Sequence, residues 1–128
     1  MRWLNRSLMD SPYSYALCTS EKEYRKELKR LKIPNANQEP FLKHNSANAT
    51  THFFESSDAH DRCCIVCLGS TEGVAKIQVY ALLVHEAVHI WQAVRDSLGE
   101  RYPGHEQEAY AVQGIAQSLM YAYKDGRK

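Results

Sequence analysis

Apolar residues recur at helical spacing in three stretches of the chain, and each stretch predicts a helix. The first covers residues 19–32 and is followed by Pro34, which cannot continue a helix. The second runs from about 70 to 98, where Gly99 is expected to stop it. The third spans roughly 105–124. The apolar positions of the second stretch are Val74, Ile77, Ala81, Val84, Val88, Trp91 and Ala93–Val94. Those of the third are Ala109, Val112, Ala116, Leu119, Met120 and Tyr123.

Two strand-like stretches lie between the first and second predicted helices. Residues 49–55 contain a pair of phenylalanines, and Cys63–Leu68 is a continuous apolar run typical of a well-buried strand. A polar turn over 56–61 separates them, so we expect an antiparallel hairpin. Residues 1–18 and 33–48 show no regular pattern and predict irregular structure.

These elements together predict an α+β domain. We expect a small antiparallel sheet to pack on the second helix and on the C-terminal helix, with a further helix near the N-terminus. At 128 residues the chain is the length of a single domain. Residues 1–48 are expected to form an N-terminal extension and helix, and residues 49–124 the core.

Composition and charge narrow the functional classes. The net charge is +1, so no overall field attracts the protein to nucleic acid or to a membrane. Residues 22–32 are basic on one side, but interleaved glutamates favour a solvated helix over a nucleic-acid surface. No segment approaches the roughly 20 apolar residues of a membrane span, and no signal-length apolar run follows Met1. The oligomeric state is not indicated.

The four cysteines are expected to be reduced. Cys63 and Cys64 are neighbours and poor disulfide partners, and reduced thiols are typical of a cytoplasmic protein. Cys64 and Cys67 form a CxxC pattern, but on a strand their thiols would point to opposite faces. We therefore interpret the cysteines as small buried apolar residues rather than as a metal or redox site.

The second predicted helix carries the chain's strongest chemical motif, in which His85, Glu86 and His89 form an HExxH pattern. Residues four apart share one face of a helix, so the two imidazoles would lie close enough to bind one metal ion. Zinc suits two imidazoles and a carboxylate, with a position left for water. Glu86 lies about 100° round the helix, where it can take a proton from that water. The motif predicts one Zn²⁺ per chain in a zinc-dependent peptidase, with Glu86 as general base.

The third metal ligand is expected at the start of the C-terminal helix, where Glu106 and Glu108 both lie. The two glutamates are about 200° apart on a helix, so only one of them can face the histidines. A helical wheel places Glu108 beside Ala109 and Val112 on the inner stripe and Glu106 on its flank. Helix geometry alone therefore slightly favours Glu108.

An HExxH motif on one helix followed by a glutamate on the next resembles the gluzincins, the thermolysin-like clan of zinc metallopeptidases. The small domain resembles the minigluzincins, and it also resembles small phage-encoded zincin-like proteins. The resemblance rests on His85–His89 and Glu106–Val112 and covers roughly residues 49–124. It implies a minimal zincin-like fold, zinc as cofactor, and a peptide or protein substrate lying extended along the sheet edge, beside Cys63–Leu68.

The resemblance also bears on the third ligand. Several of these families carry it as Glu-x-x-Ala/Ser-Asp/Asn-x-Phe/Leu, a register that makes Glu106 the ligand and Ala109 the small residue. An aminopeptidase-like spacing after His89 would instead select Glu108. We take Glu106 as first choice, Glu108 as second and His105 as third.

Tyr110 departs from the family pattern, because it stands where these families place an Asp or Asn that orients a zinc-bound histidine. Tyr110 is also a candidate donor to the oxyanion that forms at the scissile carbonyl, as are Tyr102 and His105. The missing carboxylate keeps an alternative open, in which the chain is a catalytically weak or inactive zincin-like binding protein with a structural zinc.

Overall fold

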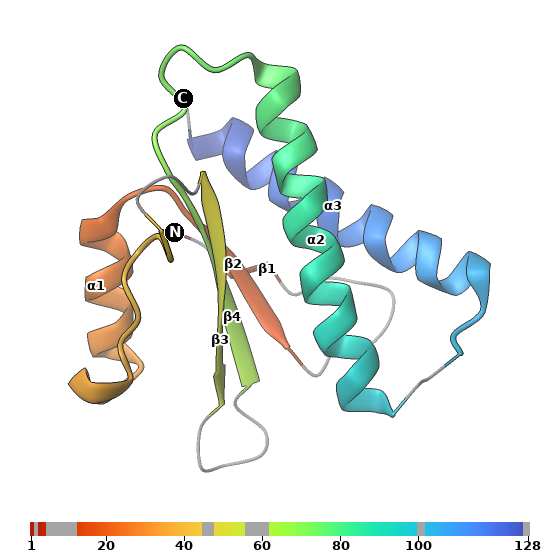
Figure 1. Ribbon diagram of the computed structural model, residues 1–128, viewed down its shortest axis with the longest axis horizontal. Helices are drawn as coiled ribbons and strands as arrows, with labels where there is room; N and C mark the ends of the chain where they lie inside the picture. The colour runs from red at the N-terminus through yellow and green to blue at the C-terminus, as the bar shows by residue number, and fades with distance from the viewer. Residues whose placement is uncertain (2, 5–12, 45–47, 56–61, 100–101, 127–128) are drawn as a thin grey trace.

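The computed structural model describes residues 1, 3–4, 13–44, 48–55, 62–99 and 102–126. Over these residues the chain forms a sheet of four strands and three α-helices, with a short 3-10 turn (Figure 1). In chain order the elements are β1 (Trp3–Leu4), β2 (Ser14–Cys18), α1 (Glu21–Arg30), the 3-10 turn (Asn35–Asn37), β3 (Ala49–Glu55), β4 (Arg62–Leu68), α2 (Lys76–Leu98) and α3 (His105–Gly126). The α+β class and the three helices predicted from the sequence are confirmed.

The sheet is mixed rather than antiparallel, which corrects the sequence-based expectation. Its strand order is β1-β2-β4-β3, with β2 parallel to β4 and the β3–β4 hairpin antiparallel as predicted. Strands β1 and β2 lie within residues 1–18, where we expected irregular structure. Strand β2 has only five residues, of which all but Ser14 are buried, so it lacks the alternation that marks a half-exposed strand.

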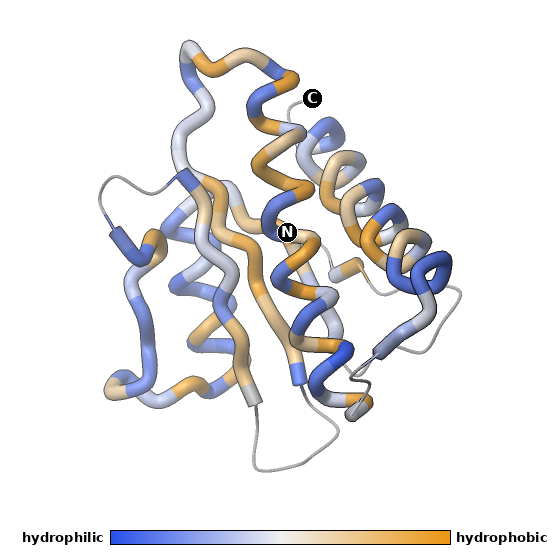
Figure 2. Tube along the Cα trace, turned by 45° about the vertical axis from the view of Figure 1, so that its right-hand side comes forward, coloured by the Kyte–Doolittle hydropathy of each residue, from blue (hydrophilic) through white to orange (hydrophobic). Residues whose placement is uncertain are grey.

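The helices cover both faces of the sheet. Helix α1 packs on one face, and α2 and α3 pack together on the other (Figure 1). The apolar run of β4 passes between them through the middle of the molecule (Figure 2). Because side chains of a strand alternate, Cys64 joins the core under α2 and α3 while Cys67 joins the core under α1.

Helix α2 begins at Lys76, later than predicted, and ends at Gly99, whose φ of 71° is the left-handed conformation that favours glycine. Trp91 and Val94 are buried as predicted, but the rest of its inward face differs from the predicted one. The residues buried on it are Val79, Leu83, Glu86, Ala87, Ile90, Trp91 and Val94. Val74, Ile77, Ala81 and Val84 are exposed, Ile77 by 77%. The helix carries two apolar stripes, and helical spacing alone does not tell which stripe faces the core.

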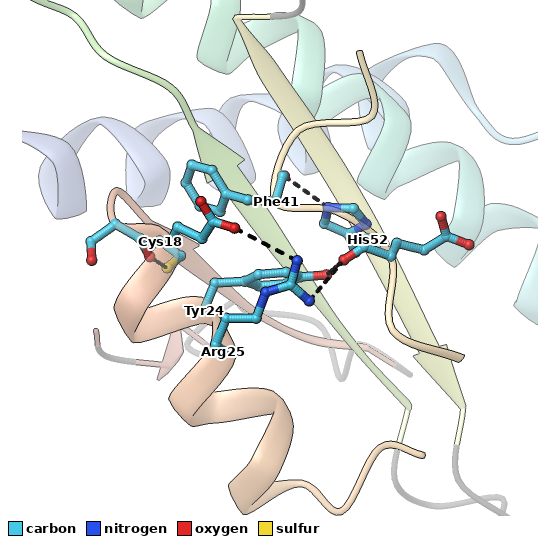
Figure 3. Close-up of polar contacts among 8 residues, drawn as sticks. Cys18, Tyr24, Arg25, Phe41 and His52 are labelled. Carbon is cyan, nitrogen blue, oxygen red and sulfur yellow. Dashed lines mark hydrogen bonds and ion pairs between the residues drawn. The ribbon is translucent and has the colours of Figure 1, made fainter. Parts of the chain in front are cut away.

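On the face of the sheet covered by α1, side chains of α1 and β3 form hydrogen bonds with the segment that follows the 3-10 turn (Figure 3). The Tyr24 hydroxyl donates to the Glu39 carbonyl at 3.0 Å, and the Arg25 guanidinium donates to the same oxygen at 3.4 Å. On the neighbouring strand β3, the buried His52 ring stacks on Tyr24 and places Nε2 3.0 Å from the Phe41 carbonyl. Side chains from α1 and β3 therefore hold this segment against the sheet.

All four cysteines are thiols, as expected, and Cys18, Cys64 and Cys67 are buried. Burial raises the pKa of the Cys64 and Cys67 thiols well above the usual range. Since the thiolate is the form that binds metals and attacks electrophiles, the CxxC pattern is not a reactive site. Separately, within the part of the chain that the structure describes, no helix is long and apolar enough to span a membrane.

Candidate metal centre

Helix α2 presents the two motif histidines on its exposed side while its opposite side packs on the sheet. His85 and His89 lie one helical turn apart, and their Nε2 atoms are 3.2 Å from each other. Two ligand nitrogens about 2.05 Å from a tetrahedral zinc lie roughly 3.3 Å apart. The separation of the two Nε2 atoms therefore fits two positions of a zinc ion, as the HExxH motif predicts.

Glu86 lies between the histidines and the sheet. It is only 4% exposed, and its Oε2 accepts a hydrogen bond of 2.6 Å from the Thr51 hydroxyl. Thr51 is on β3, opposite Val66 of β4, and β3 is one of the two terminal strands of the sheet. The carboxylate of the motif is therefore held against strand β3, next in the chain to His85.

The start of α3 separates the two glutamates that were candidates for the third ligand. Glu106 is exposed, and no contact of its carboxylate is described. Glu108 faces α2, where its Oε2 accepts a hydrogen bond of 2.8 Å from the Trp91 indole and lies 3.8 Å from the Arg95 guanidinium. Helix geometry had placed Glu108 on the inward side, and the structure agrees with that placement.

The histidine pair is not joined by a third ligand in this arrangement. Within the described ranges, no three His, Cys, Asp or Glu side chains are gathered as a metal site requires. The structure thus brings His85 and His89 together but not Glu106 or Glu108 with them. The residues present fit zinc at two positions, and neither Glu106 nor Glu108 supplies a third ligand where it lies.

Tyr110 lies on the outer side of α3 and is 68% exposed. It is two residues from Glu108 and so about 200° round the helix from the side that meets α2. Tyr102, another candidate donor, is 93% exposed. The structure does not place these candidates among the contacts of the histidine pair.

Two polar partners of the site were not found from the sequence. Thr51 bonds to Glu86 across 35 residues, which only strand pairing and helix packing determine. Gln92 lies on α2 itself, and its Oε1 is 3.3 Å from Nδ1 of His89. The i,i+3 spacing of His89 and Gln92 was a usable indication of this second contact.

Comparison with known proteins adds no further assignment, since no protein-family model, curated protein or solved structure matches the chain. The chemistry of the site is therefore argued from its own residues. Two exposed imidazoles can bind a divalent transition metal and leave positions open to water or substrate. A buried carboxylate beside them can hold or accept a proton.

Proposed function

We propose that this chain is a zinc-dependent peptidase. The observation that carries the proposal is the convergence of the His85 and His89 Nε2 atoms, 3.2 Å apart, beside the buried carboxylate of Glu86. The spacing of the histidines brings them together on any helix, so the buried carboxylate of Glu86, bonded to Thr51, is what supports a site over an accidental pair. Four thiols in the chain support a cytoplasmic location.

His85 and His89 would hold the zinc, which supplies a Lewis acid that acidifies water and polarises a carbonyl. Glu86 is the general base, which takes the proton of the attacking water and returns it to the leaving amine. Thr51 donates to one carboxylate oxygen of Glu86 and leaves the other available for that proton. The hydroxyl therefore holds the base in place and satisfies part of its buried charge.

The substrate is an extended peptide that adds to the sheet. Our sequence-based expectation placed it beside Cys63–Leu68, but β4 is paired with β2 on one side and with β3 on the other. Strand β3 is one of the two edge strands of the sheet, and its Thr51 contacts Glu86. A peptide paired with β3 would lie next to the base and the histidines, so we assign the substrate to this edge.

The third protein ligand of the proposed zinc is Glu106 or Glu108. Glu106 is uncommitted but exposed, whereas Glu108 faces α2 and is engaged by Trp91 and Arg95. Zinc content of Glu106→Ala and Glu108→Ala, each compared with wild type, distinguishes the two. Wild type is expected to hold about one zinc per chain. The third ligand is the glutamate whose replacement lowers this zinc content.

The engagement of Glu108 is also the observation that favours a second function. If Glu108 and Glu106 both stay where they are, the chain is a zincin-like binding protein whose zinc is structural and whose turnover is weak or absent. That function requires a stable zinc site and predicts no peptide cleavage. It further predicts that Glu86→Gln leaves partner binding intact.

Cleavage of a peptide library, followed by mass spectrometry, tests the proposal on zinc-loaded protein. We expect products from wild type and from Glu72→Gln, an exposed control outside the site. We expect none from Glu86→Gln, although that variant keeps its zinc, and none from His85→Ala, which loses it. Undiminished cleavage by Glu86→Gln would refute the general base. Zinc without cleavage in any variant would favour the binding protein, and no zinc in wild type would end both proposals.

A further inference from the structure

His89 has contacts at both of its ring nitrogens. Its Nε2 lies 3.2 Å from Nε2 of His85, and its Nδ1 lies 3.3 Å from Oε1 of Gln92. His89 and Gln92 are both exposed on α2 and lie three residues apart, so the same helix carries both partners. The ring of His89 is therefore fixed from two sides without any help from α3.

The contact with Gln92 is the one that bears on which nitrogen of a neutral His89 ring carries the proton, since the contact between the two Nε2 atoms can have its donor on either ring. The Oε1 atom of Gln92 is an acceptor only, so the contact is a hydrogen bond only when Nδ1 of His89 is protonated. A neutral imidazole carries a single N–H, which leaves Nε2 with its lone pair directed toward His85. This is the tautomer in which Nε2 can bind a metal ion.

We infer that Gln92 is a positioning residue for the metal centre, and that it presets His89 as a ligand through Nε2. The inference rests on the proposed function in so far as it concerns the metal. It assigns to Gln92 the orienting role that the resembled families give to an Asp or Asn, whose position Tyr110 occupies in this chain. Tyr110 is 68% exposed on the outer side of α3, whereas Gln92 contacts the ligand directly.

The two histidines are not equivalent under this assignment. Since Nε2 of His89 is the acceptor, Nε2 of His85 is the donor in the 3.2 Å contact between them. His85 must then move its proton to Nδ1 before its own Nε2 can bind zinc. Among the described contacts none is to Nδ1 of His85, so Gln92 prepares one ligand of the pair and not the other.

His52 provides an internal reference with the opposite tautomer. Its Nε2 lies 3.0 Å from the Phe41 carbonyl, which only accepts, so Nε2 of His52 carries the proton. His52 is on the α1 face of the sheet and is remote in sequence from Gln92. A change at Gln92 is therefore expected to leave the His52 tautomer as it is.

The tautomers are measurable by long-range ¹H–¹⁵N correlation spectra of the whole chain, recorded after chelation and at alkaline pH. We expect an Nδ1–H tautomer for His89 and an Nε2–H tautomer for His52. Gln92→Leu removes the acceptor and is expected to shift His89 toward Nε2–H. Gln92→Glu keeps an acceptor and is expected to preserve Nδ1–H. Gln113→Leu, at an exposed position of α3, is the matched control.

Zinc affinity, measured by competition with a chelating dye, tests the consequence for the metal. Loss of the partner of a histidine ligand typically weakens metal binding 10- to 100-fold. We expect roughly 10-fold weaker binding by Gln92→Leu, and wild-type or tighter binding by Gln92→Glu and Gln113→Leu.

Two results would overturn the inference. One is an Nε2–H tautomer for His89 in wild type, and the other is a zinc affinity that Gln92→Leu leaves unchanged. Peptide cleavage by wild type tests the peptidase proposal independently of the role of Gln92. Wild type that binds zinc without cleaving peptides would remove the peptidase but keep the role of Gln92. Wild type that binds no zinc would remove the metal centre, while the tautomer spectra would still decide whether Gln92 orients His89.

Discussion

The two faces of the sheet use histidine in opposite ways. On the α1 face, His52 is buried, stacks on Tyr24 and donates to a carbonyl of its own chain (Figure 3). On the other side of the molecule, His85 and His89 are exposed, and their described contacts are with each other and with Gln92. A buried histidine satisfied by the backbone contributes to folding. An exposed pair with converging nitrogens contributes little to folding and remains available to a ligand.

Glutamate shows a parallel rather than a contrast. On α1, Glu27 accepts from the Trp3 indole at 3.2 Å and pairs with Arg30. On α3, Glu108 accepts from the Trp91 indole at 2.8 Å and lies 3.8 Å from Arg95. The same three residue types thus meet on both faces. Glu27 lies away from the HExxH motif, so its contacts with Trp3 and Arg30 are structural. Since Glu108 makes the same kinds of contact, the comparison indicates that they also support the fold.

The largest expected difference between the faces is in stability. Leu28 is fully buried under α1, so Leu28→Ala is expected to lower the free energy of unfolding by about 3 kcal/mol. His85→Ala should change it by less than about 0.5 kcal/mol, because the side chain is exposed. Urea unfolding followed by circular dichroism measures both, with the exposed Lys26→Ala as control. A large loss in His85→Ala would make the histidine pair structural and cancel the contrast.

High pH is expected to destabilise both faces alike. Burial raises the pKa of Cys64 on the α2 face and of Cys67 on the α1 face, whereas thiols of the unfolded chain ionise from about pH 8.5. The folded chain therefore holds more protons above that pH. Stability is complete below about pH 8.5 and falls as the pH rises, by up to about 1.4 kcal/mol per unit for each thiol.

Urea unfolding at several pH values between 7 and 10 checks this dependence. Cys64→Ala and Cys67→Ala should each make the alkaline decline shallower by a similar amount, because burial and not the particular face causes the shift. A decline that neither variant alters would assign it to other groups, such as the tyrosines.

The sequence predicted those elements whose pattern is local. The antiparallel hairpin of residues 49–55 with the Cys63–Leu68 run was found because a continuous apolar run needs no distant partner to be recognised. Ser14–Cys18 was missed because it is short and buried on both faces, and its neighbour β4 lies far along the chain. The inward positions of α2 were predicted correctly at Trp91 and Val94 but wrongly at Ile77, Ala81 and Val84, because its two apolar stripes have the same period.

The candidate metal centre likewise has one part that local sequence predicts and another that depends on how distant elements pack. The spacing of His85 and His89 determines their proximity on any helix, so this part was predictable. The burial of Glu86 against Thr51 depends on how α2 lies on β3, which no local pattern records. The engagement of Glu108 depends on the packing of α3 against α2 and was likewise not predictable.

Glu108→Ala tests the parallel between the two Trp–Glu–Arg groups. Removing a carboxylate that accepts from an indole is expected to cost about 1 kcal/mol of stability. Glu106→Ala, the matched control on the same helix turn, should cost less than about 0.5 kcal/mol, since Glu106 is exposed. Trp91 emission, recorded in a Trp3→Phe background, should change in Glu108→Ala only. Equal stability of the two variants would deny Glu108 a structural role and leave its carboxylate for the metal.

The smallest expected effect is the acid dependence that Glu27 contributes. Its hydrogen bond from Arg30, helped by that from Trp3, lowers the pKa of Glu27. A carboxylate with a depressed pKa stabilises the fold above its unfolded value of about 4.3, and this contribution is lost as the pH falls through the folded pKa. Arg30 is 61% exposed, so solvent limits the contribution to less than about 1 kcal/mol.

Glu27→Gln should therefore be slightly less stable than wild type at pH 7 and nearly equal to it at pH 3. Urea unfolding at the two pH values gives the difference, and Glu23→Gln on the same helix is the control. Glu108→Gln is expected to differ from wild type by a similar amount at both pH values, because Glu108 lies 3.8 Å from a partly exposed Arg95 guanidinium and solvent weakens such a contact. An acid-dependent loss in Glu108→Gln as large as that in Glu27→Gln would show that the Arg95 contact is a true ion pair, and the two groups would then match in charge as well as in composition.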